Sequence, residues 1–103
     1  MSNYNDNDTS VLDKDDAEVK EPSMYKVVFY NDDYTPMHVV TAVLISFFGK
    51  SEQDANSIMM KVHKEGRGLA GTYTYDIAQT KKEQSISTVR ALGFPLKIEI
   101  EEE

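Results

Sequence analysis

Hydrophobic residues after position 23 recur with two different spacings. Three short runs are rich in β-branched and aromatic residues, as strands are, and cover residues 24–30, 68–74 and 95–100. Three longer segments repeat apolar residues every three or four positions, as amphipathic helices do, and cover residues 36–48, 52–65 and 75–91. The order β-α-α-β-α-β predicts an α+β fold, with a small three-stranded antiparallel sheet that carries three helices on one face.

Residues that typically begin and end helices divide these segments. Thr35 is expected to cap the first helix, with Pro36 at its first helical position. Ser51, followed three residues later by Asp54, is typical of a capping box at the second helix, and Thr74 is a candidate cap for the third. Glycine readily adopts the left-handed backbone in which helices commonly end. The three helices are therefore expected to stop at Gly49, Gly66 and Gly93.

Charge is distributed unevenly along the chain of 103 residues, whose formal net charge is −7. Residues 1–21 contain seven acidic residues against two lysines, and they lack apolar periodicity. Such a segment cannot bury enough apolar surface to offset its ordering entropy. We therefore predict that residues 1–22 are a disordered acidic extension and that residues 23–103 form the folded domain. The acidic balance would repel phosphate backbones, which argues against a nucleic-acid partner.

Several classes of protein are disfavoured by what the sequence lacks. It contains no cysteine, which excludes disulfides, thiolate metal sites and cysteine nucleophiles. No apolar stretch approaches the ~18 residues that a membrane-spanning helix needs. The polar, acidic residues 1–20 do not resemble a signal or transit peptide. We therefore expect a cytoplasmic protein with no membrane partner and no cofactor.

Three local features are candidates for binding chemistry. The first is the turn Asn31-Asp32-Asp33 before the first helix, and the second is His63 near the end of the second helix. The third is an apolar stripe on these two helices, made of Met37, Val40, Met59 and Val62. Taken singly, they also match an ordinary turn, a structural histidine and a core stripe. If the link Gly49–Lys50 joins the helices as an antiparallel pair, however, the start of one meets the end of the other.

An antiparallel pair would place Asn31, Asp32 and His63 at the mouth of a pocket whose floor is the apolar stripe. Leu96, from the last predicted strand, would close that pocket. A carboxylate, an amide oxygen and an imidazole nitrogen suit a group with several N–H donors, and the floor suits a hydrophobic side chain attached to it. The first residue of another polypeptide offers this combination. The residue types therefore predict a pocket for a protein's N-terminus.

Four motifs, in the same order, resemble those of the ClpS family of bacterial adaptors for N-degrons. They are YNDDYTPM at residues 30–37, VHKEGRGLAG at 62–71, AQTK at 78–81 and PL at 95–96. The resemblance covers about residues 23–101 and implies a fold similar to the C-terminal domain of the ribosomal stalk protein. It also implies an adaptor, not an enzyme, that delivers substrates with N-terminal Leu, Phe, Tyr or Trp to ClpA, the AAA+ unfoldase of the ClpAP protease.

The resemblance implies roles for individual residues. Family residues that match Asn31, Asp32 and His63 bind the α-amino group. Those that match the side-chain pocket correspond to Thr35, Met37, Val40, Met59, Val62 and Leu96. Residues that match Asp76 and Lys81 lie in the surface that docks on the N-domain of the unfoldase, although this chain has Asp76 and Gln79 where the family usually has Glu. The N-terminal extension is implied to take part in handing over the substrate.

Two other functions are compatible with parts of the sequence. A metal-dependent hydrolase would use Asp32, Asp33 and His63 as ligands, with His38 nearby, but their spacing matches no closed metal motif and no activating base is evident. A scaffold of the ribosomal-stalk type would need no amine pocket, so the free N-terminus of its partner would not matter. Nucleophilic catalysis has no support, because no serine lies in a nucleophile elbow.

Overall fold

The computed structural model describes residues 22–103. Its elements follow the predicted order and are β2 (Met24–Tyr30), α2 (Met37–Phe48), α3 (Glu52–Glu65), β3 (Arg67–Thr74), α4 (Tyr75–Ala91) and β4 (Lys97–Glu102). The predicted fold class, an α+β domain with three helices and a three-stranded antiparallel sheet, is confirmed. The predicted acidic extension at residues 1–22 lies outside the described residues except for Pro22.

The sheet has the order β3-β2-β4, and β2 pairs antiparallel with both neighbours. Because successive side chains of a strand point to opposite faces, β2 has an inner and an outer side. Val27 and Phe29 belong to the core, whereas Lys26, Val28 and Tyr30 alternate with them and point to the other face. The apolar inner face of the sheet therefore needs a cover.

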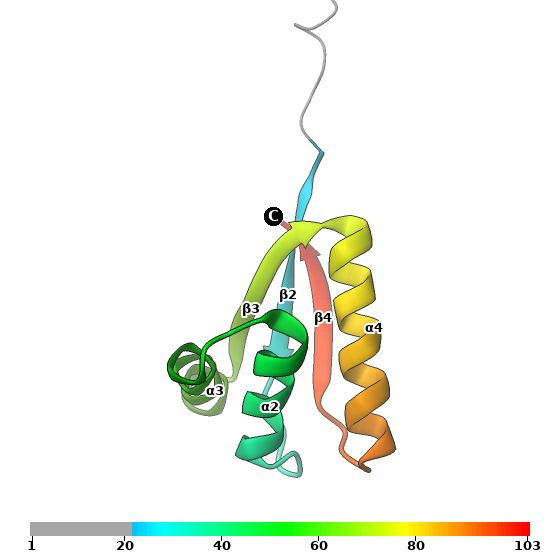
Figure 1. Ribbon diagram of the computed structural model, residues 1–103. Coiled ribbons are helices and arrows are strands. Elements are labelled where there is room, and N and C mark those ends of the chain that lie inside the picture. Colours follow the sequence, from blue (N-terminus) through cyan, green and yellow to red (C-terminus); the bar gives the residue numbers. More distant parts are fainter. Residues whose placement is uncertain (1–21) are drawn as a thin grey trace, which may run out of the picture.

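All three helices supply that cover from the same side of the sheet (Figure 1). Their buried apolar residues join those of the strands in one core, which includes Val27, Phe29, Val43, Leu44, Ala55, Val62, Ala70, Ala78, Val89 and Ile98. The only polar side chain buried in the core of the described part is Ser85 on α4, and its hydroxyl donates to the carbonyl of Lys81 at 2.7 Å, so it is satisfied there. None of these helices is long and apolar enough to cross a membrane.

The three helices end at the predicted residues 48, 65 and 91, whereas the predicted N-terminal caps are confirmed in one of three cases. Gly49 and Gly66 end α2 and α3 with left-handed backbone, at φ 65° and 91°. Ser51 accepts a hydrogen bond from the Asp54 N–H at 3.1 Å, so the predicted cap of α3 is confirmed. The Thr74 side chain makes no capping hydrogen bond to α4. That helix ends at Ala91, as predicted, and Leu92 is its C-cap in place of Gly93, whose φ is also positive.

The prediction that Thr35 caps α2 is wrong. Pro36 is the residue that precedes the helix, and its carbonyl accepts from the N–H groups of Val39 and Val40 at 3.0 and 3.3 Å. The hydroxyl of Thr35 instead donates to the Asp32 carboxylate at 2.9 Å, and no side chain makes a capping hydrogen bond to α2. The turn therefore uses Thr35 to hold Asp32 in place and not to begin the helix.

The predicted antiparallel pairing of the first two helices is also wrong. In Figure 1, α3 is seen nearly end-on whereas α2 runs in the plane of the view, so the two helices cross. The left-handed Gly49, whose N–H bonds to the Leu44 carbonyl, turns the chain sharply after α2. The C-terminal half of α3 then packs Val62 against Gly68 of β3. This crossing still brings the start of α2 near the end of α3.

The last strand begins two residues later than predicted. Residues 94–96 form a loop, and the Arg90 guanidinium donates from Nη1 to the carbonyls of Phe94 and Leu96 at 3.0 and 2.9 Å. A carbonyl occupied by a side chain from α4 does not take part in the ladder with β2, which begins at the pair of Tyr30 and Lys97.

Gly68→Ala should destabilise the protein by about 1–3 kcal/mol, because it overpacks the contact between α3 and β3. An added Cβ would lie 2.8 Å from Val62 Cγ2 and 3.3 Å from the Ile58 carbonyl oxygen. Neither the stiff valine nor the helix backbone can give way cheaply. Chemical denaturation would measure the loss, with Gly71→Ala as a contrast, since there the Cβ meets the end of the Tyr73 side chain. An unchanged unfolding free energy in Gly68→Ala would contradict this close contact.

Candidate functional site

A pocket of about 350 Å³ lies where the turn after β2, the start of α2 and the end of α3 meet. Its walls combine polar turn residues with apolar helix residues: Asn31, Asp32, Asp33, Tyr34, Thr35, Pro36, Met37, Val40, Met59, Val62 and His63. Eight of the nine residues predicted for the amine and side-chain sites are in this set. The crossing of α2 and α3 thus assembles the predicted site by a different geometry.

Asp32 is held rigidly at this pocket by its own turn. Its Oδ1 accepts from the backbone N–H groups of Tyr34 and Thr35, each at 2.7 Å, and its Oδ2 accepts from the Thr35 hydroxyl at 2.9 Å. A carboxylate has about four acceptor positions, so these contacts leave Oδ2 able to accept from a ligand. The oxygen is therefore fixed in place before any ligand arrives.

The same contacts keep Asp32 ionised. Partial burial by itself would raise the pKa of Asp32, but the hydrogen bonds from the Thr35 N–H, the Tyr34 N–H and the Thr35 hydroxyl outweigh it. The positive charge of Arg90 adds a smaller effect in the same direction, and the pKa ends below its ordinary value. The pocket therefore presents a fixed negative charge at neutral pH.

An NMR titration of the Asp32 carboxyl should give a midpoint below about 3.9, the ordinary value for aspartate. Because the pKa is depressed in the folded state, the stabilisation from this group is complete above the unfolded-state pKa and is lost as the pH falls through the folded-state pKa. The unfolding free energies of the wild type and Asp32→Asn should accordingly converge below about pH 4. A midpoint above 3.9 would show that burial wins over the turn hydrogen bonds.

Asn31 and His63 reach the same pocket from two different elements. Asn31 follows the last residue of β2, and His63 lies in the last turn of α3. Both side chains are exposed at the pocket, in contrast to the partly buried Asp32. The two segments are joined by a backbone hydrogen bond from the Asn31 N–H to the Gly66 carbonyl at 2.9 Å. An amide oxygen, a carboxylate and an imidazole therefore surround one opening.

The apolar wall of the pocket comes from α2 and α3. Val40 and Val62 are buried at its base, with 6% and 2% of their surface exposed. Met59 is partly buried beside them, whereas Met37 is 43% exposed at the rim. The wall thus ends in a flexible thioether at the position where a ligand would enter.

The structure does not place Leu96 in this pocket. It is 1% exposed and belongs to the core, and it is not one of the lining residues. Its carbonyl is bound by Arg90, which holds the chain before β4 against α4. Sequence reasoning also missed Asp33, Tyr34 and Pro36 as lining residues. The sequence signal for these residues was the turn itself, because every residue of a tight turn at the mouth of a pocket is exposed to that pocket.

Metal binding finds no support in the part of the chain that is described. Residues 22–103 contain no group of three or more His, Asp or Glu side chains arranged to hold an ion. Asp32, Asp33 and His63 do border one pocket, but they do not form such a group.

The family model described as "ATP-dependent Clp protease adaptor protein ClpS" matches residues 20–99. The chain belongs to the ClpS family. Proteins named "ATP-dependent Clp protease adapter protein ClpS" from Burkholderia mallei (strain SAVP1) and Burkholderia thailandensis are 50% and 48% identical to it over 95 residues, which is 92% of this chain and 91% of each relative.

A solved ClpS-family structure is similar over most of the chain. It is described as "The structure of Agrobacterium tumefaciens ClpS2 bound to L-phenylalaninamide", and its TM-score to this chain is 0.78 at 38% identity. The match covers 81% of this chain and all of the other. Sequence and structure therefore agree on the family that the motifs at residues 30–37 and 62–71 indicated, a family of adaptors for the Clp protease.

The two residues predicted to dock on the unfoldase lie in the N-terminal half of α4. Asp76 is exposed in the first turn of this helix. Lys81 is only partly exposed, because its ammonium donates to the Phe47 carbonyl at 2.8 Å and lies 5.2 Å from the ring centroid of Tyr73. Lys81 thus ties α4 to the end of α2, whatever its role toward a ClpS partner.

Lys81→Met should lower the unfolding free energy by about 1–3 kcal/mol, because it leaves the Phe47 carbonyl without its donor. The methionine keeps most of the aliphatic stem. Lys82→Met is the matched control, since Lys82 makes only a long contact with Glu99 at 3.7 Å. Thermal and chemical denaturation of both variants would measure the difference in their unfolding free energies. Equal stability of the two would show that the hydrogen bond from Lys81 to the Phe47 carbonyl does not stabilise the domain.

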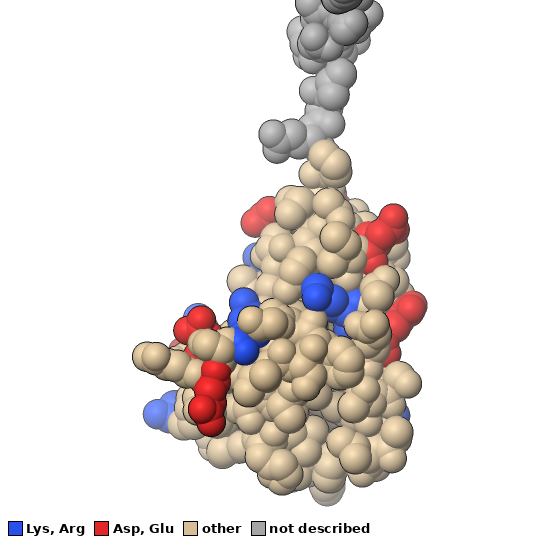
Figure 2. Space-filling model, in the orientation of Figure 1, with Lys and Arg blue, Asp and Glu red and all other residues tan. Residues whose placement is uncertain are grey.

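A second groove, of about 360 Å³, lies between α2 and the C-terminal half of α4. Its walls are mainly apolar, from Val39, Val43, Phe47, Leu92 and Phe94. Figure 2 shows that the lower part of this face carries almost no charged side chains. The groove and the exposed Asp76 are therefore at opposite ends of α4, and they are chemically unlike each other.

Proposed function

We propose that this ClpS-family chain binds the free α-amino group and the bulky hydrophobic first residue (Leu, Phe, Tyr or Trp) of N-degron substrates. It is an adaptor and not an enzyme, and it delivers these substrates to the ClpA unfoldase for degradation by ClpAP. The observation that carries the proposal is the pocket in which a preoriented, ionised Asp32 stands beside an apolar wall. A similar protein was solved with L-phenylalaninamide, which has both a free α-amine and a bulky side chain.

The residues around the pocket divide the recognition between charge and shape. The α-ammonium group is a cation with three donors, so Asp32 supplies charge attraction and Asn31 an additional acceptor. His63 accepts through a ring nitrogen, directly or through water, when its imidazole is neutral. The side chain of the first residue then lies against the wall of α2 and α3, where Val40 and Val62 form the base.

The energies of these contacts are compatible with a releasable complex. Burial of a Leu or Phe side chain contributes about 1.5–3 kcal/mol, and each hydrogen bond to a charged group a further ~1.5–3 kcal/mol. Association and ordering cost at least ~4 kcal/mol. A micromolar complex needs about −8 kcal/mol, so three such bonds and the apolar contact bring the affinity only near that range. Binding of this strength suits an adaptor that must release its cargo.

Fluorescence anisotropy with labelled peptides tests the binding step. A Phe-first peptide should bind at micromolar concentration, and the same peptide with Ser as its first residue should bind at least about tenfold more weakly, because it lacks the apolar contact. Equal binding of both peptides would contradict a pocket that reads the first residue and would favour a scaffold.

Degradation assays test the delivery step separately. A fluorescent Phe-first reporter should disappear with ClpA, ClpP and ATP only when this chain is present. Removal of residues 1–20 should leave peptide binding intact and slow the degradation, if the acidic extension takes part in delivery. If that deletion changes neither binding nor degradation, the extension only contributes charge. If the full chain binds but never accelerates degradation, the delivery half of the proposal is wrong.

A further inference from the structure

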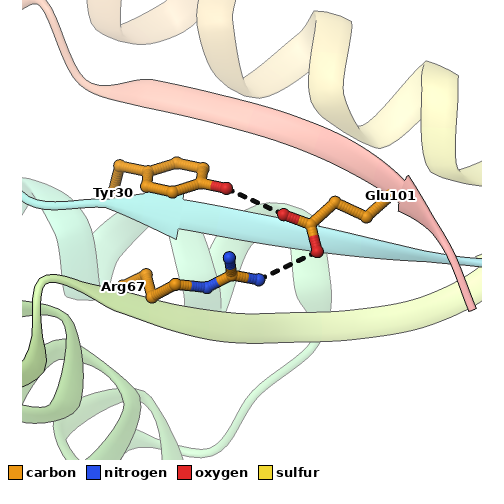
Figure 3. Close-up of polar contacts among 3 residues, drawn as sticks. All are labelled: Tyr30, Arg67 and Glu101. Carbon is orange, nitrogen blue, oxygen red and sulfur yellow. Dashed lines mark hydrogen bonds and ion pairs between the residues drawn. The ribbon is translucent and has the colours of Figure 1, made fainter.

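Three side chains on the outer face of the sheet form a bridge across all three strands (Figure 3). The Glu101 carboxylate on β4 accepts from the Tyr30 hydroxyl of β2 at 2.8 Å and from Arg67 Nη2 of β3 at 2.9 Å, one partner on each oxygen. The Arg67 guanidinium also lies 5.3 Å from the centroid of the Tyr30 ring. We call these three residues the outer brace.

The outer brace lies next to the two chain segments that bring Asn31 and His63 to the pocket. Tyr30 is the last residue of β2 and immediately precedes Asn31. Arg67 is the first residue of β3 and immediately follows Gly66, the end of the helix that carries His63. Tyr30 and Arg67 are register partners, and the next link along the chain is the hydrogen bond from the Asn31 N–H to the Gly66 carbonyl at 2.9 Å.

We infer that Tyr30, Arg67 and Glu101 are positioning residues that hold the Asn31 and His63 segments at the spacing a ligand's α-ammonium group requires. This inference rests on the proposed function and adds three residues to it. None of the three lines the pocket. They act through the strand ends, because a shift of Tyr30 against Arg67 moves Asn31 against the end of α3.

The exposure of the brace makes a purely stabilising role a poor explanation. The side chains of Arg67 and Glu101 keep 49% and 33% of their surface exposed. Exposed ion pairs contribute little to global stability. The electrostatics nevertheless agree with a formed network, since the hydrogen bond from Arg67 first, and that from Tyr30 next, lower the pKa of Glu101. Such a network can instead fix the local geometry where β2 ends and β3 begins.

The strand that carries Glu101 also provides a matched control. Glu99 lies two residues earlier on the same face and forms an exposed ion pair with Lys82 at 3.7 Å. Its register partner is Val28, and the hydrogen bonds of Tyr30 and Arg67 go to Glu101 instead. Glu99→Gln therefore removes the same charge from the same strand and leaves the brace intact.

The experiment compares the wild type, Glu101→Gln, Tyr30→Phe and Glu99→Gln in the full chain. Affinities are measured for Leu-first, Phe-first and Tyr-first peptides, and by NMR titration for the N-acetylated Phe-first peptide. Glu101→Gln should weaken all three free-amine peptides by the same factor of about three to ten and keep their ranking, and Tyr30→Phe should do so by about half as much. The acetylated peptide should bind equally weakly to all four proteins, and melting temperatures should change by less than about 4 °C, which corresponds to under ~1 kcal/mol.

Each other outcome counts against the inference in a recognisable way. If Glu101→Gln binds like Glu99→Gln, the brace does not position the site. If free-amine and acetylated peptides weaken together, or if the affinity loss follows a loss of folded protein, the brace is merely structural. If the wild type fails to distinguish a Phe-first from a Ser-first peptide, the proposed function itself is wrong, and the brace inference fails with it.

Discussion

Asp32→Asn will weaken the binding of a Phe-first peptide by about a hundredfold or more. Asparagine keeps the size of the side chain and an oxygen that can accept, but it loses the charge that attracts the α-ammonium group. Loss of a charge-assisted contact at a partly desolvated site costs about 2–5 kcal/mol, and a hundredfold corresponds to ~2.8 kcal/mol. Anisotropy titrations of the two proteins at one pH and one salt concentration would measure the ratio.

The same result should be obtained by changing the ligand. Acetylation of the peptide removes the positive charge and two of the amine's donors, and it leaves the ionised Asp32 facing an amide. The acetylated peptide should therefore bind the wild type about as poorly as the free peptide binds Asp32→Asn. The two changes together should cost little more than either alone, because each removes the same interaction.

Asp33→Asn is the matched control for this prediction. Asp33 is adjacent in the turn, lines the same pocket and carries the same charge. The hydrogen bonds from the Tyr34 and Thr35 N–H groups go to Asp32, so only Asp32 is locked into one position. If Asp33→Asn weakens binding as strongly as Asp32→Asn, the pocket offers general negative charge and not a placed acceptor.

Met37→Ala will admit β-branched first residues. Met37 stands 43% exposed at the rim of the pocket, where its thioether can pack over an entering side chain. Leu and aromatic residues are unbranched at Cβ and pass beneath it, whereas the second Cβ substituent of Ile or Val collides with it. Relief of an overpacked contact is worth about 1–3 kcal/mol, so Ile-first and Val-first peptides should gain about ten- to a hundredfold in affinity.

The readout is the ratio of affinities for Ile-first and Leu-first peptides. Ile45→Ala is the matched control, because Ile45 lies on the same helix, is 42% exposed and does not line the pocket. It should leave the ratio unchanged. A Met37→Ala protein that still rejects Ile as strongly as the wild type would show that some other part of the pocket reads the Cβ position.

The amino-acid sequence by itself determined the order of the elements and the positions of the helix ends. Strand and helix periodicities depend on the next few residues only, and the left-handed backbone at Gly49 and Gly66 is a property of glycine itself. The cap at Ser51 is equally local, since its partner is three residues away. The motifs at residues 30–37 and 62–71 together also indicated the family, because each is a run of neighbours in the chain.

Only the tertiary structure decided which of these residues meet. The crossing of α2 and α3 and the withdrawal of Leu96 into the core depend on packing against the sheet. Glu101 reaches partners 34 and 71 residues away, so no pattern along the chain could reveal the brace. Such contacts are chosen by the free energy of the whole packed domain, in which a side chain's local preference is one small term among many.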